Sequence, residues 1–181
     1  KKTKAIICVH LAGYPCDMVE IVRYARSKSI KVIEDCSQAH GAKIKNKSVG
    51  SFGDIGTWSF CQDKIMTTGG EGGMITTNDE KLWKTIWSYK DHGKSFEAIF
   101  KKNHPKGFKW LHESFGTNGR MTEMQAVIGR IQLKKMSKWH KTRLINAKTI
   151  WNNAKKSDGL ITPNIPNYIE HAAYKCYVFV E

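Results

Sequence analysis

One lysine stands between a serine hydroxyl and a glycine-rich turn in residues 59–73. The serine is Ser59, the lysine is Lys64, and the turn reads Gly69-Gly70-Glu71-Gly72-Gly73. A lysine amine condenses with an aldehyde only while it is neutral, so this chemistry requires a partly desolvated site that lowers the pKa of Lys64. The stretch therefore indicates a site built to hold an aldehyde cofactor.

A carboxylate ends a short apolar run upstream of this lysine. Residues 31–35 have the pattern of a buried strand, and the last of them is Asp35. Open α/β sheets place ligands at the carboxyl ends of their strands, so we expect Asp35 to face the same crevice as Lys64. A carboxylate keeps the nitrogen of a pyridinium ring protonated while a lysine holds the aldehyde of the same cofactor. The two residues together favour a pyridinium cofactor.

Three further motifs lie at residues 32–42, 50–56 and 116–121. Together with residues 59–73, in this order and spacing, they resemble the DegT/StrS family of pyridoxal-phosphate sugar aminotransferases. The resemblance extends from Thr3 to Tyr177, which is nearly the whole chain. It implies the large domain of a fold-type I PLP-dependent transferase, with three α/β/α layers and a mostly parallel sheet.

The resemblance also implies roles for individual residues. Lys64 matches the Schiff-base lysine, Asp35 the partner of the pyridine nitrogen, and Gln38 a glutamine beside the ring. Ser59 matches a phosphate ligand, and Asn118 an asparagine that reaches the phosphate from the neighbouring subunit. The expected cofactor is pyridoxal 5'-phosphate, and the expected assembly is a homodimer with shared active sites.

The domain organisation follows from the same resemblance. Residues 1–157 are expected to form a partial cofactor-binding large domain that includes a long connecting helix, and residues 158–181 to begin a small carboxyl-terminal domain. Compared with the family, the chain resembles an internal section that lacks an amino-terminal phosphate-binding turn and much of the small domain.

The activity that the family implies is amino transfer. An amino acid, with L-glutamate as the expected donor, would give its amino group to a keto group on a nucleotide-diphosphate sugar, of the 4-keto-6-deoxy type as in the perosamine synthase-like branch. The product would enter O-antigen or another surface polysaccharide. Family members that dehydrate sugars carry histidine in place of the lysine, so Lys64 favours transamination. A dehydratase-like protein and a non-catalytic regulator of the same family are the alternatives.

Each candidate residue also has an ordinary structural interpretation. Asp35 could cap the turn after its strand, and Asn118 could be a turn residue with a left-handed backbone. Ser59 could hydrogen-bond within a strand end. Lysine is usually a solvated surface residue, and Gln38 alone indicates nothing. The combination around Lys64, rather than any single residue, favours the functional interpretation.

Composition excludes several other classes. Thirty basic and sixteen acidic residues give a formal net charge of +14, but the lysines are scattered and no aromatic RNA-binding signature accompanies them. We therefore expect no nucleic-acid partner, whereas a positive field would suit a nucleotide sugar.

The glycines form neither a P-loop nor a dinucleotide-binding pattern. The five cysteines form no Cys-x-x-Cys pair, so no metal is expected. No membrane span or secretion signal is apparent, which indicates the cytoplasm.

Hydrophobic periodicity predicts an α/β chain. Strands are expected over residues 5–10, 31–35, 57–60, 73–77 and 174–181, and helices over residues 17–29 and 80–89. The capping box at residues 122–125 predicts the start of a long amphipathic helix that continues toward Gly159. Residues 91–117 are expected to form a long irregular connection.

Overall fold

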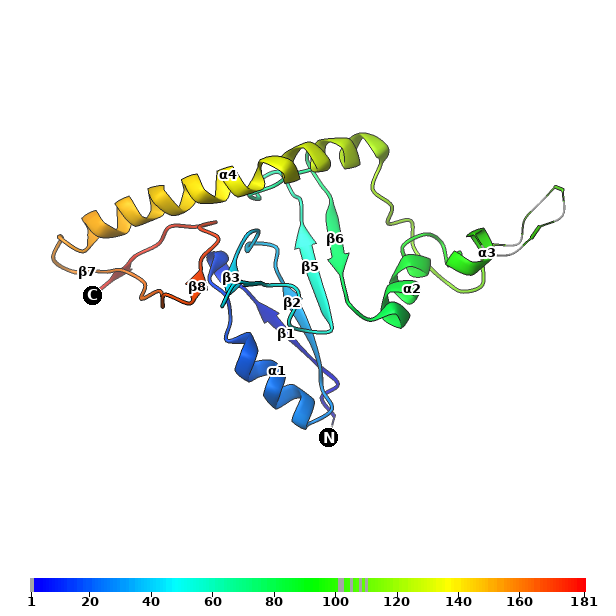
Figure 1. Ribbon diagram of the computed structural model, residues 1–181, viewed down its shortest axis with the longest axis horizontal. Helices are drawn as coiled ribbons and strands as arrows, with labels where there is room; N and C mark the ends of the chain where they lie inside the picture. The colour runs from blue at the N-terminus through cyan, green and yellow to red at the C-terminus, as the bar shows by residue number, and fades with distance from the viewer. Residues whose placement is uncertain (1, 101–102, 105, 108, 110) are drawn as a thin grey trace. The chain divides into compact units, whose positions relative to one another are not determined.

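The computed structural model describes residues 2–100, 103–104, 106–107, 109 and 111–181 (Figure 1). The chain divides into two compact units. One unit contains the chain up to Thr76 together with Glu123–Glu181, and the other contains Thr77–Thr122. The domain boundary expected between residues 157 and 158 stays a prediction.

A four-stranded sheet forms the centre of the first unit. Its strands, in spatial order, are β1 (Ala5–Val9), β2 (Lys31–Asp35), β5 (Ile55–Ser59) and β6 (Gly73–Thr76). The first three are parallel, and β6 is antiparallel to β5. The register sets Asp35 beside Val9 on one side and Thr57 on the other. The expected mostly parallel sheet is confirmed, and four of the expected strands lie close to their expected positions.

Helix α1 (Met18–Ser27) packs on one face of this sheet. It begins after Asp17, whose side chain accepts a hydrogen bond from the Glu20 N–H, as an N-cap residue should. The residues that form the hydrophobic core here are Cys8, Met18, Val22, Ala25, Val32 and Ile44. The expected helix is confirmed, and its apolar face fixes β1 and β2 in place.

Two small sheets were not expected from the sequence. One contains β4 (Lys47–Ser48), β3 (Lys43–Ile44) and β8 (Ile169–Glu170), and the other contains β7 (Leu160–Ile161) and β9 (Phe179–Val180). The strand expected over residues 174–181 is wrong except at β9. The reason is that the backbone before β9 bonds elsewhere: the Lys175 N–H donates to Ala12, and the Tyr177 carbonyl accepts from the Trp151 indole.

Helix α4 (Glu123–Ala154) is the long helix that the capping box predicts. Its first half contacts the glycine-rich turn. The Gln125 amide donates to the Glu71 carbonyl, and the Gln132 side-chain oxygen accepts from the Thr67 N–H at 2.9 Å. A Cβ atom at the buried Gly129 would come within 2.9 Å of the Thr68 methyl group. The helix therefore fixes the turn that follows β5.

The second unit contains α2 (Glu80–Tyr89), as expected, and α3 (Phe96–Phe100), which was not expected. Asp79 caps α2 through hydrogen bonds from the Lys81 and Leu82 N–H groups. An aromatic cluster joins the helices and consists of Trp83, Trp87, Phe96 and Phe100. Within the segment expected to be irregular, residues 101–102, 105, 108 and 110 lie outside the described residues.

Candidate active site

The carboxyl ends of β2 and β5 bring the first two candidate residues to one edge of the sheet. Asp35 is the last residue of β2, and Ser59 is the last residue of β5. The strands are parallel neighbours with Asp35 beside Thr57, so both strands end at the same edge. Lys64 lies in the turn that directly follows β5. This is the edge at which open α/β sheets bind ligands.

Asp35 is half-buried and combines two possible roles. Its Oδ1 accepts a hydrogen bond from the Ser37 N–H at 3.0 Å, so Asp35 does cap the turn after its strand. Its Oδ2 has no hydrogen-bond partner within the described part of the chain. The cap therefore orients the carboxylate and leaves one oxygen able to accept a hydrogen bond from a protonated ring nitrogen.

Gln38 and Ser59 are also held by backbone contacts. The Gln38 Oε1 accepts from the Ala12 N–H at 2.6 Å, which turns the amide toward the loop after β1. The Ser59 Oγ accepts from the Cys61 N–H at 3.3 Å. A serine hydroxyl that accepts one hydrogen bond still has a hydrogen to donate, so Ser59 keeps the capacity to bind a phosphate oxygen.

The Lys64 amine is paired with a carboxylate. Its Nζ donates to Asp63 Oδ1 at 2.8 Å and lies 5.5 Å from the centre of the Tyr174 ring. Its side chain is only 15% exposed. The hydrogen bond to Asp63 raises the pKa of Lys64, so the lowering expected from the sequence is wrong in this structure. The physical reason is the adjacent carboxylate, which stabilises the ammonium form more than partial burial destabilises it.

Sequence reasoning missed the second partner of this carboxylate. The Tyr174 hydroxyl donates to Asp63 Oδ2 at 2.6 Å, although the two residues lie far apart in the chain. Hydrogen bonds from Lys64 and Tyr174 together hold the pKa of Asp63 well below its usual range. Asp63 was visible beside Lys64 in the sequence, but no local signal connects Tyr174 to it.

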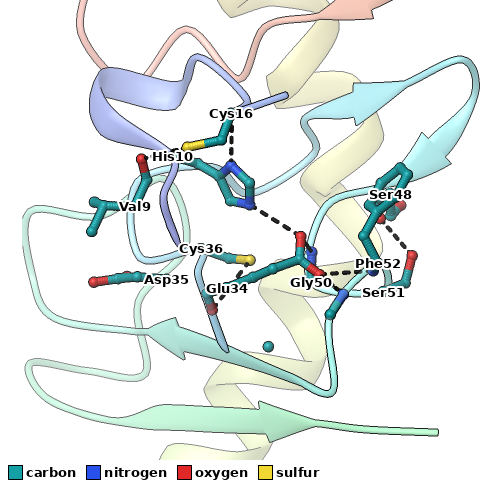
Figure 2. A network of polar contacts seen from close by, with 12 residues as sticks. Val9, His10, Cys16, Glu34, Asp35, Cys36, Ser48, Gly50, Ser51 and Phe52 are labelled. Carbon is teal, nitrogen blue, oxygen red and sulfur yellow. Dashed lines mark hydrogen bonds and ion pairs between the residues drawn. The ribbon is translucent and has the colours of Figure 1, made fainter. Parts of the chain in front are cut away.

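A buried carboxylate next to Asp35 organises the surrounding loops (Figure 2). The Glu34 Oε1 accepts from the Phe52 and Gly53 N–H groups, both at 2.7 Å. Its Oε2 accepts from the Gly50 N–H at 2.8 Å and bonds to His10 Nε2 at 3.1 Å. Burial alone would raise the pKa of Glu34, but the hydrogen bonds outweigh it and lower the pKa. The network fixes the end of β2, and with it Asp35.

His10, Glu34 and Cys36 offer ligand atoms that lie within 4.8 Å of one another. The Cys16 N–H donates to His10 Nδ1 at 3.0 Å, so Nε2 carries the ring hydrogen and donates to Glu34. Both ring nitrogens and both carboxylate oxygens are therefore already bonded. A metal ion would have to displace these contacts, so we assign the cluster a structural role.

Asn118 belongs to the second unit. It is exposed and pairs with Asp91 in an isolated antiparallel bridge, while the next residue, Gly119, donates its N–H to the Lys90 carbonyl at 2.8 Å. The turn therefore holds the Asn118 backbone and leaves its side chain at the surface. Its expected contact with the cofactor of a neighbouring subunit stays a prediction.

The four-stranded sheet, the lysine-bearing turn and the carboxylate at the strand end belong to an aminotransferase fold. The chain belongs to the DegT/DnrJ/EryC1/StrS aminotransferase family, which it matches over residues 1–181. It is similar to the structure of an aminotransferase from Psychrobacter cryohalolentis, with a TM-score of 0.97 and 58% identity over 99% of this chain and 48% of that one.

Two curated relatives have more specific names. A GDP-perosamine synthase from Escherichia coli O157:H7 is 47% identical over 74% of this chain and 34% of its own length. A UDP-N-acetyl-3-dehydro-alpha-D-glucosamine 3-aminotransferase from Acidithiobacillus ferrooxidans is 40% identical over 78% of this chain and 35% of its own length. The chain therefore spans about a third of the length of these curated relatives.

The family depends on pyridoxal phosphate. The donor set of this chain fits that cofactor, because a primary amine, a carboxylate with one free oxygen and a serine hydroxyl come from two adjacent parallel strands and the turn after them. No helix in the described ranges is both long and apolar enough to cross a membrane.

Proposed function

We propose that the protein is a pyridoxal-phosphate-dependent aminotransferase that moves an amino group from an amino acid, with L-glutamate as the donor, to a keto group of a nucleotide-linked sugar. The observation that carries the proposal is the position of Lys64 in the turn after β5, at the strand ends where Asp35 leaves one carboxylate oxygen free. Family membership and the match to sugar aminotransferases support it.

Each candidate residue then has a defined task. Lys64 holds the cofactor and, once released, carries a proton between carbon atoms as general base and general acid. Asp35 keeps the ring nitrogen protonated, and Gln38 lies beside the ring. Ser59 and the Asn118 of a second subunit bind the phosphate, so the active form is a homodimer. The bound cofactor supplies an electron sink for the substrate α-carbon.

The sugar is proposed at the level of a class. One relative is named for a GDP sugar and another for a UDP sugar, so similarity does not select the nucleotide. The 4-keto-6-deoxy type, used for O-antigen or another surface polysaccharide, is favoured by the similarity to GDP-perosamine synthase. The net charge of +14 would attract a diphosphate. The free cysteines suit a reducing compartment, the cytoplasm.

The test is covalent trapping in the complete protein. Borohydride treatment with pyridoxal phosphate should add the reduced cofactor to Lys64, as read by peptide mass spectrometry. Lys64→Ala should lose the adduct, whereas Lys84→Ala, at a surface lysine of α2, should keep it. Unchanged trapping in Lys64→Ala would overturn the assignment.

Turnover is tested separately by the release of 2-oxoglutarate from glutamate in the presence of nucleotide keto sugars. Asp35→Asn keeps an oxygen that can cap the Ser37 N–H, so the fold and the trapped lysine should persist. A neutral amide no longer holds the ring proton, so turnover should fall by roughly 100-fold or more. Trapping without turnover in the unaltered protein would favour the non-catalytic alternative, and normal turnover in Asp35→Asn would contradict its role.

A further inference from the structure

Two side chains meet at the Lys64 amine, one from the neighbouring Asp63 and one from Tyr174, which lies far away in the chain. Asp63 places one carboxylate oxygen 2.8 Å from Lys64 Nζ and the other 2.6 Å from the Tyr174 hydroxyl. The Tyr174 ring also lies 5.5 Å from the ammonium, a distance at which a cation interacts with an aromatic face. One carboxylate therefore bridges the lysine and the tyrosine.

Tyr174 is held much more firmly than Asp63. Asp63 is 54% exposed, so on its own it would sample several orientations. The Tyr174 ring packs against the buried cluster that includes Cys36 and Ile65. Backbone bonds fix the residues on either side, from Ala172 N–H to the Gly13 carbonyl and from Lys175 N–H to the Ala12 carbonyl. The anchored tyrosine hydroxyl thus orients an exposed carboxylate.

Other titratable and charged groups also lie around the amine. His40 lies nearby but is buried, and burial lowers its pKa to about 4, so it is neutral at physiological pH. Cys61 donates to Glu71 at 3.4 Å and also interacts with Asp63. Lys175 lies 5.0 Å from the Tyr174 ring centre. Among these groups, Asp63 makes the ion pair with Lys64 and Tyr174 makes the second strong contact to Asp63.

We propose that Asp63 and Tyr174 are positioning residues for Lys64: Asp63 holds the free amine as an ammonium, and Tyr174 keeps the carboxylate turned toward it. The proposal rests on the proposed function, in which Lys64 is the cofactor lysine. An ammonium has no lone pair with which to attack a carbonyl carbon, so its proton must leave to solvent first. The bridge therefore sets the pH above which the free lysine becomes reactive.

The test measures this reactivity without any cofactor. The complete protein is treated briefly with acetic anhydride between pH 6 and pH 11, and peptide mass spectrometry gives the acetylation of each lysine. Asp63→Asn should move the Lys64 profile to lower pH and increase its acetylation by roughly threefold below the midpoint. Glu80→Gln, which removes a carboxylate 3.0 Å from Lys84 on α2, should leave the Lys64 profile unchanged.

Tyr174→Phe keeps the ring and removes the hydroxyl. It should move the Lys64 profile in the same direction as Asp63→Asn but less far. In the double variant the tyrosine change should add nothing, because Tyr174 acts through Asp63. An unaltered Lys64 profile in Asp63→Asn, or effects of the two changes that simply add, would overturn the proposal. Borohydride trapping tests the proposed function separately. If the unaltered protein did not trap pyridoxal phosphate on Lys64, the proposed function would fail, but the acetylation profiles could still be measured because they need no cofactor.

Discussion

The Glu34 carboxylate shows how much one buried residue can organise. It is fully buried and accepts hydrogen bonds from three backbone N–H groups and from His10. Two of these N–H groups belong to Gly50 and Gly53. Because glycine has no Cβ atom, the backbone at these two positions can pack closely against its neighbours. A Cβ at Gly50 would lie 2.5 Å from the Trp58 ring, and one at Gly53 would lie 2.7 Å from the Val32 carbonyl. The carboxylate and the glycines therefore depend on each other.

Replacement of Glu34 by glutamine should destabilise the protein. The amide has one acceptor oxygen, and its NH₂ group would face backbone N–H donors that have lost their partner. We expect a loss of about 2–4 kcal/mol in the free energy of unfolding, measured by chemical denaturation. Glu20→Gln, at an exposed pair with Arg23, should cost less than about 1 kcal/mol. Equal stability of the two variants would contradict the structural role of Glu34.

At the scale of elements, α4 determines the shape of the turn that carries Lys64. The Gln132 Oε1 accepts the Thr67 N–H at 2.9 Å, and the Thr67 Oγ1 donates to the Phe60 carbonyl at 2.9 Å. The turn is thus bonded to the helix on one side and to the end of β5 on the other. Since Lys64 lies between Phe60 and Thr67, its position depends on both contacts.

Gln132→Ala should loosen this turn without unfolding the helix, because alanine is a strong helix former. Loss of one hydrogen bond should cost about 1 kcal/mol, and the Thr67 amide should exchange its hydrogen faster. Hydrogen exchange of peptides that span residues 60–72 would measure the effect. Lys135→Ala, at an exposed position of the same helix, is the matched control. Unchanged exchange in Gln132→Ala would mean that α4 does not hold the turn.

Local signals predicted the longer helices and the strands of the central sheet well, and the short elements and long-range contacts poorly. Asp17 and the Thr122 capping box mark the starts of α1 and α4, because a helix cap involves only neighbouring residues. Tyr174 could not be connected to Asp63, since that contact depends on the fold of residues 171–175 against Ala12 and Gly13. The same contacts replace the strand that β-propensity favoured over residues 174–178. The family motifs marked Lys64 and Asp35, but not the carboxylate that raises the Lys64 pKa.

At the scale of the whole molecule, two buried histidines link folding to pH. His40 and His171 are 5% and 1% exposed, and burial lowers the pKa of each to about 4. Neither ring nitrogen of His40 has a hydrogen-bond partner in the described part of the chain, nor does the His171 Nε2. An unfolded histidine has a pKa of about 6.5. Between pH 6.5 and pH 4 the unfolded chain therefore binds protons that the folded chain does not.

This difference predicts that the contribution of His40 and His171 to stability is fully present above pH 6.5 and is lost as the pH decreases toward 4, by up to about 3 kcal/mol for each histidine. The carboxylates with lowered pKa, such as Glu34, lose their contribution only below about pH 4.5, so the interval from pH 6.5 to pH 5 separates the effect of histidines from that of these carboxylates. His10 titrates in the opposite sense, because its pKa in the folded protein is raised, and the comparison with a histidine variant removes its effect. Chemical denaturation over this interval should give a smaller slope for His40→Phe than for the unaltered protein. His112→Gln, at an exposed histidine, should keep the original slope. A slope that His40→Phe leaves unchanged would show that His40 is not buried in its neutral form.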